Sequence, residues 1–140
     1  MISAAAASPN LSGRWKLDQE KSKLSGDYEG WQEERIVEHK DPELNVNVHS
    51  VQGGDESASS ARYRTDGKQV HNSVDGYSMT STVTWDGDAL VFESTLIEDT
   101  DTVELHDKWT LSEDANQLTI ERKQKVGNDE QSVIFVYKRM

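Results

Sequence analysis

The sequence has no cysteine, no long hydrophobic run and little positive charge. Without cysteine, the chain can form no disulfide framework and carry out no thiol chemistry. No apolar run approaches the ~20 residues that a membrane-spanning helix needs, so we predict no membrane span. There are 15 Lys and Arg residues against 26 Asp and Glu residues, a net charge of −11. Because nucleic acids and anionic membranes attract a surplus of basic residues, this composition disfavours both as partners.

Apolar residues make up only 34% of the 140 residues. Four Trp, four Tyr and regularly spaced Val, Leu and Ile nevertheless argue against disorder. A half-polar chain of this length can fold as one domain if its strands alternate, because each strand then exposes one face to water.

The first ten residues, MISAAAASPN, differ in composition from the rest. Their alanine run resembles the end of a secretory signal, although the basic and long apolar parts of a signal are missing. We interpret residues 1–10 as a signal remnant or a disordered lead, and residues 11–140 as the folded domain. This interpretation favours an exported protein, periplasmic or secreted.

Turn signals recur at short, regular spacing along the remaining chain. In order they read KDPE, QGGDES, TDGK, VDGY, WDGD, EDTD, SEDANQ and GNDE. Three contain Asp-Gly, a strong hairpin signal because Gly accepts a positive φ. The runs between them, about eight residues each, are rich in Val, Thr, Trp and Tyr and show no helical period. The pattern predicts an all-β fold of about ten consecutive antiparallel strands.

The side-chain alternation stays in phase through every predicted hairpin, as a sheet with one buried face requires. The predicted cross-strand partners are Tyr63 with Val70, Asn72 with Met79, Val74 with Tyr77, Ser81 with Phe92, Val83 with Leu90, Trp85 with Asp88, Leu96 with Val103, Asp107 with Arg122, Trp109 with Ile120 and Arg122 with Phe135. One face of the sheet thus becomes largely apolar. Closing the sheet into a single up-and-down barrel buries that face and removes both edges.

The stretch LSGRWKLDQEKS resembles the first-strand signature of the calycins, the lipocalins and fatty-acid-binding proteins, in which Gly-x-Trp begins the barrel. The stretches TVTWDGDALVFES and VIFVYKR resemble the middle and final strands of the fatty-acid-binding type. The motifs GxWKLD and WDGD are also similar to those of a bacterial family of exported, lipocalin-like proteins. The resemblance implies that Trp15 closes one barrel end and that Lys138 or Arg139 lies over its ring.

The sequence departs from the fatty-acid-binding pattern at two places. Only about a dozen residues separate the first two strands, too few for the family's two-helix lid. The positions matching the family's carboxylate clamp carry Trp109, Phe135 and Tyr137, so only the tyrosine of the clamp remains. The resemblance therefore implies an internal ligand that is not held in the family's manner.

The predicted inward face combines apolar side chains with a few polar ones. We predict that the ligand-binding residues are Tyr77, Met79, Phe92, Ser94, Leu105, Asp107, Trp109, Arg122, Gln124, Phe135 and Tyr137. Asp107 and Arg122 should pair, because burying a lone charge costs several kcal/mol. The pair either orients the polar head of a ligand or is a structural cross-strand ion pair.

The four histidines do not form a metal-ligand pattern. His49, His71 and His106 have outward parity, and His39 is the single inward candidate. We therefore predict neither a metal nor a cofactor.

Three functions stay open. We favour reversible binding of a small, largely apolar molecule by a monomer or weak homodimer. The alternatives are a barrel enzyme, such as a cyclase, isomerase or hydratase of a lipid-like or terpenoid-like substrate, with Asp107 or Tyr137 as its acid–base group, and a filled barrel that acts as a structural or interaction module.

Overall fold

The computed structural model describes residues 9–74 and 76–140. Of the predicted lead, residues 1–8 lie outside this part, as does Asp75 of the predicted Asp75-Gly76 turn. The described chain forms one short 3-10 helix, η1 (Gly26–Tyr28), and ten strands. These are β1 (Gly13–Leu17), β2 (Gln32–Lys40), β3 (Glu43–Gln52), β4 (Asp55–Arg64), β5 (Val70–Val74), β6 (Tyr77–Asp86), β7 (Ala89–Glu98), β8 (Asp101–Leu111), β9 (Gln117–Val126) and β10 (Asp129–Arg139).

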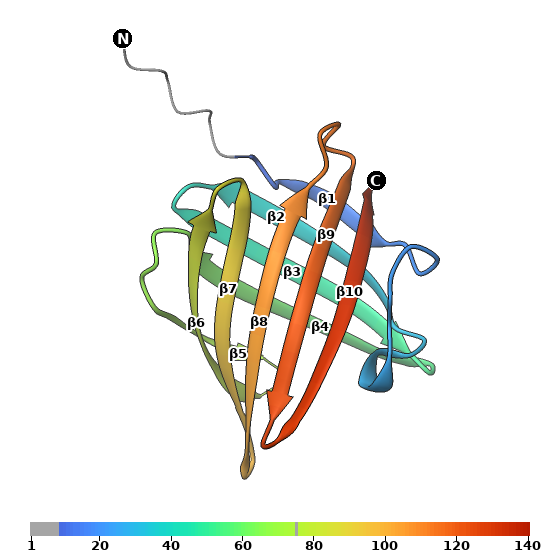
Figure 1. The fold of residues 1–140 in the computed structure, drawn as a ribbon, viewed down its shortest axis with the longest axis vertical. Helices are drawn as coiled ribbons and strands as arrows, with labels where there is room; N and C mark the ends of the chain where they lie inside the picture. Colours follow the sequence, from blue (N-terminus) through green and yellow to red (C-terminus); the bar gives the residue numbers. More distant parts are fainter. Residues whose placement is uncertain (1–8, 75) are drawn as a thin grey trace.

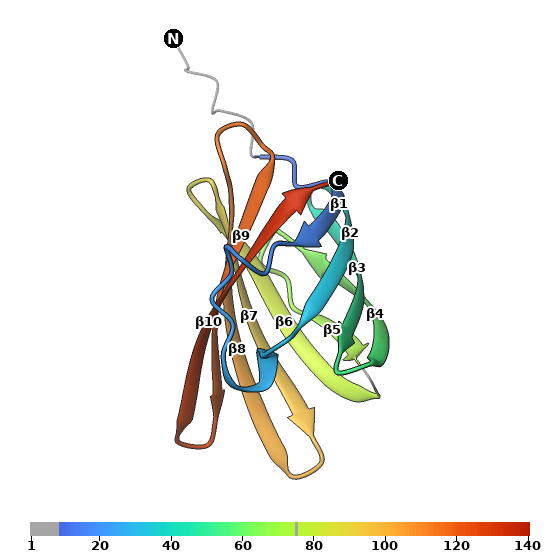
Figure 2. The ribbon, with the colours of Figure 1, turned by 90° about the vertical axis from the view of Figure 1, so that its right-hand side faces the viewer.

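The strands form one antiparallel sheet in the order β4-β3-β2-β1-β10-β9-β8-β7-β6-β5. Figure 1 shows β7 to β10 running side by side across β2 to β4, which lie behind them. In the side view these two groups are the two walls of a flattened barrel, joined where β1 pairs with β10 (Figure 2). The predicted all-β, up-and-down barrel is confirmed, and η1 is the one helical element between β1 and β2 in the described chain. It is not long enough to cross a membrane.

The barrel closes less completely than predicted. Strands β4 and β5 stand at the two ends of the strand order and share no ladder of backbone hydrogen bonds among the described residues. The predicted pairing of Tyr63 with Val70 is therefore wrong. The side chain of Asn72 bridges the gap instead: its Nδ2 donates to the Arg62 carbonyl, and its Oδ1 accepts from the Arg62 amide, both at 2.9 Å.

Most of the predicted register is confirmed. The structure pairs Asn72 with Met79, Val74 with Tyr77, Leu96 with Val103, Asp107 with Arg122, and Trp109 with Ile120. Two hairpins differ from prediction by two residues. In place of the expected partners, the structure pairs Trp85 with Leu90, Val83 with Phe92, Ser81 with Ser94, and Arg122 with Val133.

The reason for both shifts is the position of a glycine. Gly87 and Gly127 have φ of 60° and 61°, and each is the first residue of a two-residue turn. A turn of this kind needs a positive φ at its first central residue, so it begins at the glycine itself. Because a shift of two residues preserves side-chain parity, every inward residue still faces inward.

The apolar core closes one end of the barrel around Trp15, which is fully buried with Leu118 and Tyr137. The guanidinium carbon of Arg139 lies 4.3 Å from the centre of the Trp15 ring. Of the two candidates for this position, Arg139 is the one that fills it. The neighbouring Lys138 is exposed.

Candidate functional site: a polar network in the barrel cavity

The two walls of the barrel enclose a cavity of about 560 Å³. Alternate residues of β2 to β4 form one side, and those of β6 to β9 form the other. Eight of the residues predicted to bind a ligand line this cavity: Met79, Phe92, Ser94, Leu105, Asp107, Trp109, Arg122 and Gln124. A groove of about 530 Å³ also lies over β6 to β9, but mostly polar side chains of the outer face line it.

Three predicted residues lie outside the cavity lining: Tyr77, Phe135 and Tyr137. Phe135 is 3% exposed and belongs to the closed core. It pairs with Ile120 rather than Arg122, and this two-residue shift moves it and Tyr137 towards the Trp15 end. Tyr77 is half-buried at the start of β6.

Asp107 and Arg122 form the cross-strand ion pair that their register predicts. The Nε and Nη2 atoms of Arg122 donate to the two carboxylate oxygens of Asp107, each at 2.8 Å. Asp107 is 7% exposed, so the carboxylate is held in a dry environment by two parallel hydrogen bonds. Burial by itself lowers the pKa of Arg122, but the Asp107 charge and hydrogen bonds raise it well above its ordinary value.

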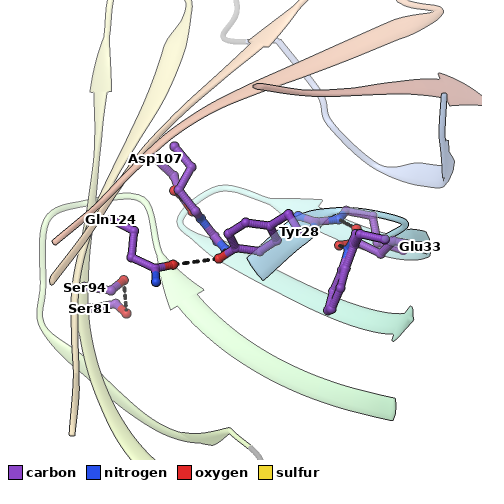
Figure 3. A network of polar contacts seen from close by, with 9 residues as sticks. Tyr28, Glu33, Ser81, Ser94, Asp107 and Gln124 are labelled. Carbon is purple, nitrogen blue, oxygen red and sulfur yellow. Dashed lines mark hydrogen bonds and ion pairs between the residues drawn. The ribbon is translucent and has the colours of Figure 1, made fainter. Parts of the chain in front are cut away.

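Tyr28 joins this pair from the segment between β1 and β2. Its hydroxyl donates to Gln124 Oε1 at 2.8 Å and accepts from Arg122 Nη1 at 3.1 Å. Figure 3 shows Tyr28 reaching across the interior towards Gln124. Its ring packs edge-on against Phe135, with centroids 5.2 Å apart. The sequence analysis missed Tyr28, because neither strand alternation nor a hairpin signal covers this segment.

A second buried ion pair, between Glu33 and Arg35 on β2, was also missed. Arg35 Nε donates to the Glu33 carboxylate, which also accepts from Trp31 Nε1 at 3.2 Å. The Arg35 guanidinium carbon lies 4.7 Å from the centre of the Tyr137 ring. Strand alternation could have identified both residues, since they share the inward parity of β2 with the buried Val37.

Electrostatics keep the Glu33–Arg35 pair charged. Burial raises the pKa of the Glu33 carboxyl, but the Arg35 charge and hydrogen bond outweigh it, so the pKa lies below its ordinary value. Burial, and after it the nearby Asp107 charge, raises the pKa of Tyr63 to about 12. Burial also raises the pKa of Tyr137 well above its ordinary value, and the Glu33 carboxylate adds to this.

Four further polar side chains lie in the interior outside the two ion pairs. Ser81 and Ser94 share a hydrogen bond of 2.7 Å across β6 and β7 (Figure 3). The indole nitrogen of Trp109 and the hydroxyl of Tyr137 are buried, and neither makes a well-aligned hydrogen bond to a described residue. The Tyr137 hydroxyl nonetheless lies close enough to Glu33 for the carboxylate to affect its pKa.

The histidines lie where parity predicts. His49, His71 and His106 are exposed, and His39 is buried. His39 Nδ1 accepts from the Leu11 amide at 3.0 Å, and Nε2 lies 2.6 Å from Asp41 Oδ1, so it ties the start of the domain to β2. In the described chain, no three His, Cys, Asp or Glu side chains are grouped so that they could hold a metal ion.

The two acid–base candidates are not arranged for proton transfer. Both carboxylate oxygens of Asp107 accept hydrogen bonds from Arg122. Tyr137 lies behind the cavity lining. Neither candidate therefore presents a free acid–base group to the cavity.

Known proteins share this architecture. No protein-family model matches the sequence, and no curated protein does either. Among solved structures, human cRBP IV matches with a TM-score of 0.63 and 14% identity, covering 94% of this chain and 99% of that chain. The fold is that of a calycin barrel.

Two further calycin barrels illustrate the range of similar structures. A Schistosoma mansoni fatty acid binding protein in complex with arachidonic acid has a TM-score of 0.57 and 15% identity, covering 98% of this chain and 99% of that chain. A secretory abundant heat soluble protein from Ramazzottius varieornatus has a TM-score of 0.62 and 13% identity, covering 92% of this chain and 94% of that chain. The calycin resemblance predicted from Gly13-x-Trp15 is confirmed for the fold, and the bacterial relationship stays a prediction.

Proposed function

We propose that this calycin barrel reversibly binds a small, largely apolar molecule in its cavity. The observation that carries the proposal is the open interior: about 560 Å³ lies within the range of ~300–1,000 Å³ of ligand pockets. Similar structures include a fatty acid binding protein solved in complex with arachidonic acid. An open interior also favours binding over a filled structural module.

Apolar side chains provide the affinity in this proposal. The cavity is lined by Val46, Val48, Val74, Met79, Phe92, Leu96, Val103, Leu105 and Trp109. Removing apolar ligand surface from water contributes about 25 cal/mol per Å². The polar network around Arg122 orients one end of the ligand.

The proposal is tested by titrating the protein with N-phenylnaphthylamine, an uncharged dye that fluoresces in apolar surroundings. We expect binding of one equivalent, and we expect Leu105→Trp to weaken it at least about tenfold, because the larger ring occupies the cavity. The matched control is Ile97→Trp, which places the same ring on the outer face, where Ile97 is 54% exposed.

Circular dichroism of each variant checks that the barrel is folded. Equal dye affinity in both Trp variants, or no dye binding by the unchanged protein, would contradict an internal site. Export and a monomeric or weakly dimeric state stay predictions from the sequence, and size-exclusion chromatography of the purified chain tests the second.

A further inference from the structure

Every basic side chain that lines the cavity in the described structure already has its own carboxylate. Two guanidiniums are present, Arg35 and Arg122, and no lysine or histidine joins them. Arg122 makes two hydrogen bonds to Asp107, and Arg35 makes one to Glu33. Both carboxylates are more than nine-tenths buried and also line the cavity. These two buried ion pairs therefore carry no net charge.

Aromatic rings also lie near both guanidiniums. Arg122 Nη1 donates to the Tyr28 hydroxyl at 3.1 Å, and its guanidinium carbon lies 5.5 Å from the centre of the Phe135 ring. The guanidinium carbon of Arg35 lies 4.7 Å and 5.3 Å from the ring centres of Tyr137 and Trp109. At Arg122 an incoming anion thus meets an occupied fork, and at both residues it meets a guanidinium that is already paired with a carboxylate and packed near aromatic rings.

Further negative charge lines the same cavity at the β7–β8 hairpin. Glu98 and Asp101 are direct cross-strand partners there, and both belong to the cavity lining. With Glu33 and Asp107, the lining carries four carboxylates against two guanidiniums. The whole chain has a net charge of −11, which adds a long-range repulsion of anions.

We infer that the cavity selects an uncharged amphiphile, such as a long-chain alcohol or amide, and rejects the matching carboxylate. A carboxylate would have to displace Asp107 or Glu33 from its arginine, or be buried without a counter-charge, and both are costly. An uncharged hydroxyl or amide can hydrogen-bond at the edge of the Tyr28–Gln124–Arg122 network without breaking an ion pair. This inference rests on the proposed function and specifies its ligand class.

The test compares dodecanol with dodecanoic acid as competitors of the uncharged dye, below the concentrations at which either self-associates. Near pH 8, about three units above a carboxyl pKa, the acid is ionised while the alcohol is not. We expect the alcohol to compete at least about tenfold more strongly than the acid. Dodecylamine, with the same chain and a positive head, should also compete more weakly than the alcohol, because Asp107 and Glu33 are already paired with arginines and the buried ammonium would lack a counter-charge.

Charge-removing variants reverse the preference if the inference is correct. Asp107→Asn leaves Arg122 without its carboxylate, so the dodecanoate affinity should rise at least about tenfold while the dodecanol affinity changes less than about threefold. Glu33→Gln makes the same change at the second pair, in case the first variant does not fold. Asp66→Asn is the matched control, because Asp66 pairs with Arg64 on the protein surface.

The outcomes separate the two proposals. Dodecanoate that competes as strongly as dodecanol in the unchanged protein, or dodecylamine that competes more strongly, overturns the inference and leaves internal binding standing. Failure of the dye and all three amphiphiles to bind overturns the proposed function, and the inference with it. An equal gain of dodecanoate affinity in Asp66→Asn would show that overall charge, not the cavity pairs, sets the preference.

Discussion

Trp15 closes one end of the barrel because two neighbours determine the position of its ring. Its Nε1 donates to the Leu11 carbonyl at 3.0 Å, and Arg139 covers the ring face. Arg139 also donates to the carbonyls of Ala115 and Ser12, at 2.9 Å each. A Cβ at Gly13 would push the Arg139 guanidinium away from the Trp15 ring, and the φ of 150° there also favours glycine. The Gly-x-Trp motif thus has a steric reason as well as a packing one.

We predict that Arg139→Ala lowers the free energy of unfolding by about 2 kcal/mol, through loss of the cation–π contact and two charged hydrogen bonds. Urea denaturation followed by tryptophan fluorescence measures the change. Lys138→Ala is the control on the exposed face of the same strand and should change stability by less than about 0.5 kcal/mol. Equal effects of the two variants would contradict the role of Arg139 at the barrel end.

At the residue scale, strand parity predicted the Asp107–Arg122 pair, and the same parity would have found Glu33 and Arg35. Tyr28 is different. It reaches Arg122 from η1, and the two residues are 94 positions apart in the chain. No local pattern encodes a contact of that length, so only the folded structure could place it.

At the scale of elements, the barrel is weakest where β4 meets β5. Each pair of strands that follow one another from β5 to β10 forms a continuous ladder, whereas in the described chain β4 and β5 are joined through the Asn72 side chain. Backbone groups without a ladder exchange their amide hydrogens through small local openings. This boundary is therefore the most easily opened part of the barrel wall.

We predict that Asn72→Ala accelerates amide exchange in β4 and β5 but not in β8 and β9, and lowers the free energy of unfolding by about 1–2 kcal/mol, because the Arg62 amide and carbonyl lose their partner. Hydrogen exchange followed by mass spectrometry measures the first effect and urea denaturation the second. Ser73→Ala, one residue along on the exposed face of β5, is the control. Uniform acceleration across all strands would contradict a local bridge.

At the scale of the whole molecule, buried ionisable groups define the pH range in which the barrel is stable. The pKa of Glu33 lies below its ordinary value, and the exposed Asp66 and Asp114 also have lowered pKa values because hydrogen bonds favour their charged forms. Below pH ~4.5 the unfolded chain therefore binds more protons than the folded one, and acid favours unfolding. At high pH, burial raises the pKa of Tyr63 to about 12, so above about pH 10 the folded chain holds a proton that the unfolded chain has released. Raising the pH therefore also favours unfolding.

We predict a stability plateau between about pH 6 and pH 9, a loss of stability between about pH 5 and pH 3, and a second loss above about pH 10. Urea denaturation at a series of pH values measures the free energy of unfolding across this range. Tyr63→Phe should reduce the alkaline loss and leave the acid loss unchanged. A free energy of unfolding that rises as pH falls from 5 to 3 would contradict the lowered carboxyl pKa values.

The sequence by itself determined the fold class, the inward face, the calycin resemblance and the Asp107–Arg122 pair. It could do so because strand alternation and hairpin register are local properties that carry over from each strand to the next. The tertiary structure alone decided that the barrel stays open between β4 and β5 and that Tyr28 joins the cavity network. Those features depend on contacts between segments far apart in the chain, which only closure of the sheet brings together.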